Sequence, residues 1–151
     1  MVGRYIFALP SDEELQVFEE KINYSFANNA LLREALQVPN GSNGDGNKKI
    51  ALIGDIILDL VIVTSGYDKN KTRGEISKIS QQRVSNVNLA KQGFVHGIDR
   101  FIVKNRSQFD IMPSVMATTM EAIVGAVYLD CKQQIQPCAD VMTALGLSWP
   151  E

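Results

Sequence analysis

Two acidic residues stand inside long apolar segments of this 151-residue chain. Asp55 lies within residues 48–67, KKIALIGDIILDLVIVTSGY, and Glu121 lies within residues 113–132, PSVMATTMEAIVGAVYLDCK. An ionised carboxylate on a mostly apolar helix is costly unless it is paired, hydrogen-bonded or bound to a metal ion. Two such acids on two such segments therefore predict one shared site. The alternative is that each acid lies at a helix edge and meets solvent or a basic side chain.

The sequence around both acids resembles the two motifs of ribonuclease III domains. Residues 47–58, NKKIALIGDIIL, are similar to the family's N-E-R-L-E-F-L-G-D-(A/S)-V-L, and residues 118–130, TTMEAIVGAVYLD, to D-A-x-E-A-L-I-G-A-I-Y-L-D. Residues 74–79, GEISKI, resemble the intervening E-G-x-L-S-x-L. The resemblance runs in order over residues 24–131 and implies an all-α, dimeric, ribonuclease III-like endonuclease domain, which we expect to fill residues 1–151.

The resemblance also implies four carboxylates around catalytic Mg²⁺ ions, and only two are present. Asp55 and Glu121 occupy two of these positions, and we predict that they are the catalytic and metal-binding residues. Ala51 and Thr118 occupy the other two positions, where the family has Glu and Asp. Mg²⁺ prefers near-octahedral oxygen ligands, and hydrolysis requires the metal to activate water and stabilise developing charge. We therefore expect Mg²⁺ or Mn²⁺ binding to be weak or absent.

Helical spacing supports this arrangement. Ala51, Asp55 and Asp59 are spaced i, i+4 and i+8 and share a face, and Thr118 and Glu121 are spaced i and i+3. Asp59 is an alternative ligand, although it lies a turn beyond Asp55 on the side opposite Ala51. Two further positions that are acidic in the family are basic here, Lys48 and Arg73, and they add positive charge if the alignment holds.

The charge distribution favours a polyanionic partner in the middle of the chain. The net charge is −2, which argues against a simple electrostatic nucleic-acid binder. Residues 69–106, however, hold nine basic residues and two acidic ones, as phosphate contacts require. We predict that Arg83, Asn86 and Lys91 contact double-stranded RNA, with ordinary solvated helix faces as the alternative. The residues after 131 are too few for a double-stranded-RNA-binding domain, so we expect the RNA to be held by this domain.

Assembly and compartment follow from the same features. Leu52 stands where the family has a Phe that packs into the partner subunit, so we predict that Leu52 lies in a dimer interface. A homodimer is the expected assembly and a heterodimer the alternative. Asp55 and Asp59 interrupt the best candidate membrane span, and the acidic N-terminus lacks a basic segment leading into a long apolar one. We expect a soluble intracellular protein without membrane contact, cytoplasmic first, with nuclear or mitochondrial locations open.

Cys131 and Cys138 make no zinc pattern, and we expect two reduced thiols, with a disulfide across Pro137 as the alternative. His96 stands in a turn region with no cysteine or second histidine nearby. We therefore assign it no chemical role.

Helix signals dominate the rest of the chain. Ser11 and Glu14 form a capping box, and the clustered glycines and asparagines of residues 39–46 predict a loop. The expected helices span residues 11–23, 28–36, 47–66 and 75–92, followed by a turn near 98–103, a helix starting at Pro113 and a last helix starting at Pro137. Ile76, Ile79, Val84 and Val87 are the expected buried set of the fourth helix, and Val141, Met142, Leu145 and Leu147 that of the last.

Three functions fit this sequence. The first is a double-stranded-RNA-binding ribonuclease III fold with weak or lost cleavage, including a structural subunit or a heterodimer partner. The second is an active Mg²⁺- or Mn²⁺-dependent endonuclease that uses Asp55 and Glu121. The third is a dimerisation scaffold without an RNA role.

Overall fold

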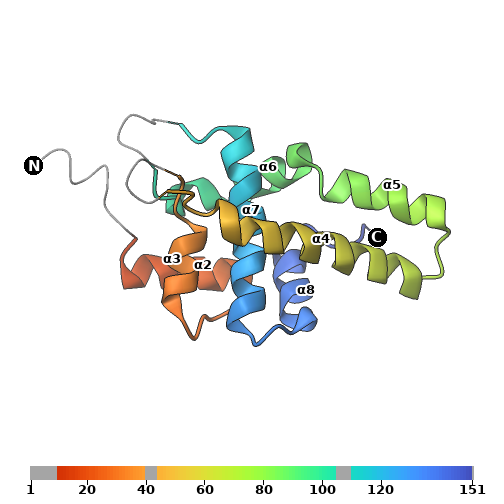
Figure 1. The fold of residues 1–151 in the computed structure, drawn as a ribbon, viewed down its shortest axis with the longest axis horizontal. Coiled ribbons are helices and arrows are strands. Elements are labelled where there is room, and N and C mark those ends of the chain that lie inside the picture. Colours follow the sequence, from red (N-terminus) through yellow and green to blue (C-terminus); the bar gives the residue numbers. More distant parts are fainter. Residues whose placement is uncertain (1–9, 40–43, 105–109, 151) are drawn as a thin grey trace, which may run out of the picture.

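The computed structural model describes residues 10–39, 44–104 and 110–150 (Figure 1). Over these ranges the chain is all-α, as the sequence predicted, and an isolated parallel bridge pairs Gln37 with Val103. The elements, in chain order, are α2 (Asp12–Ile22), α3 (Asn29–Ala35), α4 (Lys48–Asp68), α5 (Arg73–Arg83), α6 (Asn86–Val95), the 3₁₀ helix η1 (Ile98–Phe101), α7 (Pro113–Asp130) and α8 (Ile135–Ala144).

Helix α7 is the centre of the fold. It contacts α3, α4, α6 and α8, and Figure 1 shows α4 crossing it while α2 and α3 lie to its left. Its sequence is apolar almost all round, which is the pattern of a helix buried on several faces. Pro113 occupies its first turn, where the missing N–H has no helical partner to lose. The buried residues of α7 are Met116, Ala117, Thr119, Met120 and all of residues 122–127.

Local capping sets most of the other boundaries. The capping box predicted for α2 is present, with Ser11 and Glu14 each bonding the other's backbone N–H. The helix ends where Asn23 takes a left-handed conformation. Residues 40–43 of the predicted loop lie outside the described residues.

The single helix predicted over residues 75–92 is wrong, because the chain breaks there into α5 and α6. Ser85 is extended, and its Oγ accepts the backbone N–H of Asn88 at 3.1 Å, so it starts a new helix. The Asn88 side chain also donates to the carbonyl of Arg83 at 2.8 Å. Such side chains offer the backbone partners that compete with a continuous helix. As a result Val87, expected in the core, is 81% exposed, whereas Ile76, Ile79 and Val84 do pack against the core.

The last helix begins at Ile135 rather than at Pro137. Proline is tolerated there because it lies in the first turn, whose N–H groups lack helical acceptors. The expected buried set of Val141, Met142, Leu145 and Leu147 is confirmed.

Helix α4 is the one helix of the described residues that is long and apolar enough to cross a membrane by length and composition. The apolar character of α4 is explained by its two apolar faces, one buried in the domain and one exposed. One face, including Ile50, Leu58 and Ile62, is buried against the rest of the domain. A second face carries exposed apolar residues that are described below.

Candidate active site

Helices α4 and α7 cross with their backbones in direct contact, through two glycines. A Cβ atom on Gly54 would lie 1.6 Å from the carbonyl oxygen of Glu121, and one on Gly125 would lie 2.3 Å from that of Ile50. Neither position can carry a side chain without moving a helix. The crossing brings Asp55, the residue after Gly54, beside Glu121. The two acids predicted to share a site are therefore neighbours.

Asp55 lies close enough to Glu121 to influence the protonation of Glu121. Asp55 is exposed and Glu121 is half-buried. Burial, a hydrogen bond with Asp55 and the charge of Asp55 together raise the pKa of Glu121 to about 7. The pair therefore holds a proton at mildly acidic pH. A divalent cation would compete with that proton, because metal binding needs both carboxylates ionised.

The two positions predicted to have lost a carboxylate, Ala51 and Thr118, contribute no carboxylate oxygen. Ala51 is 4% exposed and ends at its methyl group. The hydroxyl of Thr118 donates to the carbonyl of Ser114 at 3.0 Å, so it is turned onto its own helix. Across residues 10–39, 44–104 and 110–150, no three His, Cys, Asp or Glu side chains gather as metal ligands. The local donor set is one pair of carboxylates.

Asp59 is held away from this pair by another contact. Its carboxylate accepts a hydrogen bond from the hydroxyl of Ser80 on α5. Asp59, Tyr67 and Arg73 line one cavity, of about 510 Å³, between α4 and α5. Arg73 is therefore placed along the α4–α5 pair, whereas Lys48 lines a different cavity together with Thr118.

Asn47 is a positioning residue that the sequence reasoning missed. It is 1% exposed, and its side-chain amide donates to the Ala35 carbonyl at 2.9 Å and to the Thr119 hydroxyl at 3.0 Å. Thr119 in turn donates to the carbonyl of Val115 at 2.9 Å. Asn47 thus fastens the start of α4 to both α3 and α7. The available signal was its place as the first residue of the signature motif.

Asp130 fastens the other end of α7. Its carboxylate accepts from the Tyr24 hydroxyl at 2.6 Å and from the backbone N–H groups of Ala27 and Asn28 at 2.9 and 2.8 Å. Burial, followed by the hydrogen bond to Asp130, raises the pKa of the Tyr24 hydroxyl. These contacts tie the α2–α3 connection to α7, so the role of Asp130 is structural.

The predicted RNA contacts lie on two helices rather than one. Asn86 and Lys91 are exposed on α6. Arg83 ends α5, and its guanidinium donates from Nε to the carbonyl of Ser148 and from Nη2 to that of Gly146, both at 2.8 Å. Much of the Arg83 side chain is therefore committed to holding the C-terminal segment.

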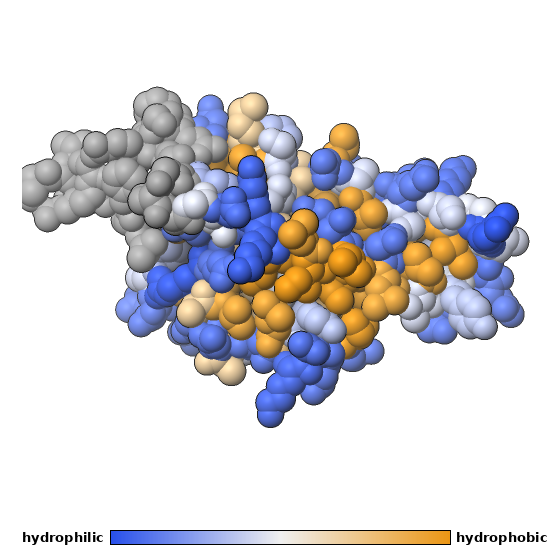
Figure 2. Space-filling model, viewed as in Figure 1, coloured by the Kyte–Doolittle hydropathy of each residue, from blue (hydrophilic) through white to orange (hydrophobic). Residues whose placement is uncertain are grey.

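An apolar stripe follows the exposed face of α4. We call the α4 stripe the residues Leu52, Ile56, Leu60, Val63 and Tyr67, of which Leu52 is 68% exposed and Tyr67 is 77% exposed. Their spacing places them along one side of the helix. In Figure 2 an apolar patch covers the position of α4 and is bordered by polar residues. A contiguous apolar patch with a polar rim is typical of a protein–protein interface.

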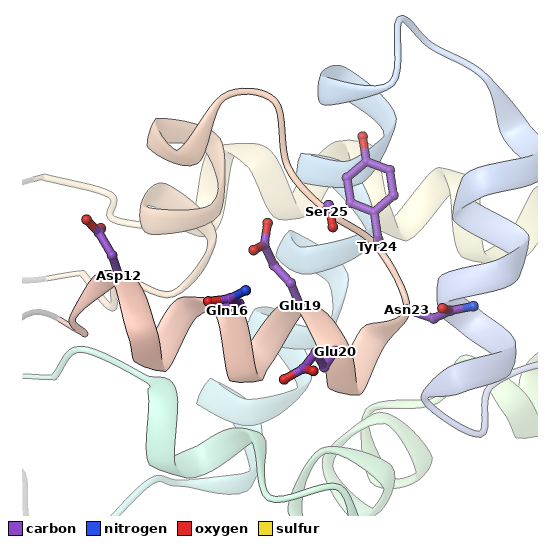
Figure 3. A pocket seen from close by; sticks show the side chains of 7 residues that line it. All are labelled: Asp12, Gln16, Glu19, Glu20, Asn23, Tyr24 and Ser25. Atoms are coloured by element: carbon purple, nitrogen blue, oxygen red, sulfur yellow. The ribbon is translucent and has the colours of Figure 1, made fainter.

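A second concavity has the wrong charge for nucleic acid. A cavity of about 460 Å³ beside α2 is lined by Asp12, Gln16, Glu19, Glu20, Asn23, Tyr24 and Ser25 (Figure 3). Glu19 already accepts the backbone N–H of Phe26 at 2.6 Å. This acidic wall would repel a phosphate backbone, so the candidate site stays at the α4–α7 crossing.

The two cysteines and the histidine form contacts with backbone carbonyl oxygens. Cys131 and Cys138 are free thiols, and burial raises the pKa of Cys138 to about 12, which keeps it protonated. Nδ1 of His96 lies 2.8 Å from the Gln92 carbonyl one turn earlier.

A helical domain with paired carboxylates at a glycine-mediated crossing of its two longest helices defines a class, the ribonuclease III nuclease domains. The family model described as the ribonuclease III domain matches residues 48–132, which include both acids and all of α4 and α7. The chain belongs to the ribonuclease III domain family.

Individual relatives agree with this assignment. The chain is 31% identical over 124 residues to ribonuclease 3 of a Nitratiruptor species, covering 78% of this chain and 55% of that protein. It is 33% identical over 126 residues to ribonuclease 3 of Fusobacterium nucleatum, covering 74% and 53%. The chain thus spans about half the length of these curated relatives.

A solved structure shares the fold. The nuclease domain of ribonuclease III from Campylobacter jejuni superposes with a TM-score of 0.68 at 23% identity, covering 88% of this chain and 92% of that one. The description of that structure refers to a region involved in dimer formation.

Proposed function

We propose that this domain binds double-stranded RNA through a ribonuclease III fold whose metal-dependent cleavage is weak or lost. The observation that carries the proposal is the composition of the site. Asp55 and Glu121 meet at the α4–α7 crossing, while the positions beside them hold Ala51 and Thr118. A site with two carboxylates offers a divalent cation half the negative charge of a site with four.

The donor set fits Mg²⁺ or Mn²⁺ in kind but not in number. Both ions accept carboxylate oxygens, and a bound ion would polarise a phosphate and activate a water molecule. Asp55 and Glu121 are the residues that would hold it. The proton on Glu121 must leave first, which lowers the apparent metal affinity below neutral pH.

RNA binding would use exposed polar and basic side chains. We propose Asn86 and Lys91 on α6 as contacts to the RNA backbone, since both are exposed. Arg83 is proposed as a weaker contact, because two of its three guanidinium nitrogens already donate to backbone carbonyls. Phosphate contacts of this kind make affinity fall steeply with salt.

The α4 stripe would form the dimer interface, with Leu52 at its start. Five large apolar side chains in water along one helix are costly, and pairing with a second such face would bury them. A second copy of this chain is the proposed partner, and a related chain with four intact carboxylates is the alternative. The proposed location is soluble and intracellular.

An active endonuclease is the alternative function, favoured by one observation. Asp55 and Glu121 are both retained and are brought together. Waters and a substrate phosphate can complete the shell of an ion held by two carboxylates, so occupancy by Mg²⁺ or Mn²⁺ does not require all four.

Restoring the missing carboxylates tests the proposal. Ala51→Glu combined with Thr118→Asp is expected to create or greatly raise Mg²⁺-dependent cleavage of double-stranded RNA. The matched control is Ala51→Gln with Thr118→Asn, which has nearly the same shape without the charge. A restored variant that folds, binds Mg²⁺ and leaves the RNA intact would contradict the proposed arrangement of the site.

A further inference from the structure

The cavity beside the replaced half of the site has a composition suited to an anion. It has a volume of about 380 Å³ and lies between the start of α4 and the first turns of α7. Its polar lining consists of Lys48 and Asn47 from the α4 side and of Ser114 and Thr118 from α7. Its apolar wall is formed by Val38, Pro39 and Val115, and none of the described residues that line it is acidic.

Lys48 supplies an uncompensated positive charge to this cavity. Its side chain is exposed, and no acidic side chain of the described residues forms an ion pair with it. The first turn of α4 contains no acid and begins with Lys48 and Lys49, at the end of the helix where the backbone dipole is already positive. Positive side chains at the positive end of the helix dipole repel it electrostatically, and a bound anion would reduce that repulsion.

The walls of the cavity are held in place by contacts already described for the crossing. The Asn47 amide is fully used, because its two hydrogen bonds go to Ala35 on α3 and Thr119 on α7. Asn47 therefore serves to fix Lys48 relative to α7 rather than to bind a ligand. On the other side, Gly46 has a φ of +56°, and a Cβ there would lie 2.5 Å from the backbone of Val38 and Pro39. This close approach sets the position of the apolar wall.

The cavity and the carboxylate pair are built on the same two helices, α4 and α7. Thr118 is one helical turn before Glu121, and Lys48 is two turns before Asp55, at spacings that keep them on shared faces. An RNA strand crossing the pair would therefore pass the cavity with a neighbouring phosphate.

We propose that this cavity is a phosphate-binding site in which Lys48, with the hydroxyls of Ser114 and Thr118, directly binds a backbone phosphate of double-stranded RNA. The inference rests on the proposed RNA binding and adds a specific contact to it. Lys48 holds the phosphate by its charge, without a metal ion. The Ser114 hydroxyl can donate to the phosphate by rotating about Cβ–Oγ. The Thr118 hydroxyl can do so by exchanging its bond to the Ser114 carbonyl for one to the phosphate. This contact would let the domain bind RNA even though it lacks two of the carboxylates that would bind the RNA through a metal ion.

The test compares Lys48→Gln with Lys49→Gln, its exposed neighbour, which does not line the cavity. Binding of the full chain to a double-stranded RNA is measured over a range of salt concentrations without divalent ions. Each lost phosphate contact reduces the slope of log affinity against log salt by roughly 0.9, the value for duplex DNA. We expect this reduction for Lys48→Gln and an unchanged slope for Lys49→Gln. Equal reductions in both variants would overturn the proposal and leave RNA binding itself intact.

A second measurement separates the ligand from its source. Inorganic phosphate is titrated into ¹⁵N-labelled protein at constant ionic strength, with chloride as the balancing anion. We expect saturable shifts of the Ser114 and Thr118 amide signals that disappear in Lys48→Gln. Small amide chemical-shift changes spread over many residues would contradict a specific phosphate-binding site in the cavity. If the wild-type protein does not bind double-stranded RNA, the proposed function is wrong and RNA is not the ligand of the cavity. The phosphate titration then shows separately whether a free oxyanion binds in the cavity.

Discussion

Adding one methyl group at Gly54 tests the geometry on which the site depends. A Cβ at this position would lie 1.6 Å from the carbonyl oxygen of Glu121, whereas ordinary contacts begin near 3.4 Å. In Gly54→Ala the helices α4 and α7 must therefore separate by about 1.8 Å, the difference between these two distances, at their crossing. The obstacle is backbone, which cannot rotate away as a flexible side chain would.

The size of the effect follows from two opposing terms. Overpacking a core typically costs about 1–3 kcal/mol and more when backbone must move, so we take about 3 kcal/mol or more here. Replacing glycine by alanine within a helix returns up to about 1 kcal/mol. The expected net loss in the free energy of unfolding is therefore about 2 kcal/mol or more. Separation of the crossing also moves Asp55 away from Glu121, so Mn²⁺ affinity should fall.

Gly74→Ala is the matched control. Gly74 lies in α5, and nothing is within 4 Å of a Cβ built there. The same chemical change should therefore stabilise the protein by about 0.5–1 kcal/mol. Both variants are compared with wild type by urea unfolding at one fixed protein concentration, because the proposed dimer would make stability concentration-dependent. A Gly54→Ala variant as stable as Gly74→Ala would refute the close crossing of α4 and α7.

Three further predictions concern charge, assembly and positioning. The pKa of Glu121 is about 7 in the folded protein and 4.5 in the unfolded chain, so the folded state binds the proton more tightly. The free energy of unfolding should therefore fall as the pH rises from about 4.5 to about 7, by roughly 1 kcal/mol after allowing for the partial exposure of Glu121. Glu121→Gln should remove this pH dependence when unfolding is measured across the same range. Leu52→Asp places a charge at the start of the α4 stripe and should yield monomers in analytical sedimentation. The control is Val87→Asp, at a residue 81% exposed on α6, which should not change the assembly. Unchanged sedimentation of Leu52→Asp would refute the proposed interface. Asn47→Ala leaves the buried Ala35 carbonyl and the Thr119 hydroxyl without their donor and should cost about 1–3 kcal/mol of unfolding free energy, so a loss below about 0.5 kcal/mol would argue against its fastening role.

Periodic apolar segments and strong caps made most of the fold predictable. The capping box at Ser11, the start at Pro113 and the apolar length of α4 all rest on local sequence, and the structure agrees with each. The break between α5 and α6 was not predicted, because it depends on side chains of Ser85 and Asn88 that bond to the backbone and so interrupt the helix. A serine in that position fits a continuous helix equally well on spacing alone.

The site was predictable as a pairing but not as a geometry. The motif spacing placed Asp55 and Glu121 on the faces that meet. The glycine contact that joins the helices is a tertiary feature, and so is the Asn47 network, since both depend on which backbone approaches which. For Arg83, the residue type predicted a charge but not its acceptors, and those acceptors lie more than sixty positions away in the C-terminal segment.

The most direct test of the proposed function is incubation of the protein with a long double-stranded RNA in Mg²⁺ and separately in Mn²⁺. The variant Asp55→Ala/Glu121→Ala is run beside it, and RNA length and gel mobility are both recorded. We predict a salt-sensitive mobility shift for wild type and the variant alike, with cleavage absent or faint and confined to wild type. Rapid accumulation of discrete products by wild type in Mg²⁺ would contradict the claim that two carboxylates leave the site weak. Absence of any shift would contradict RNA binding.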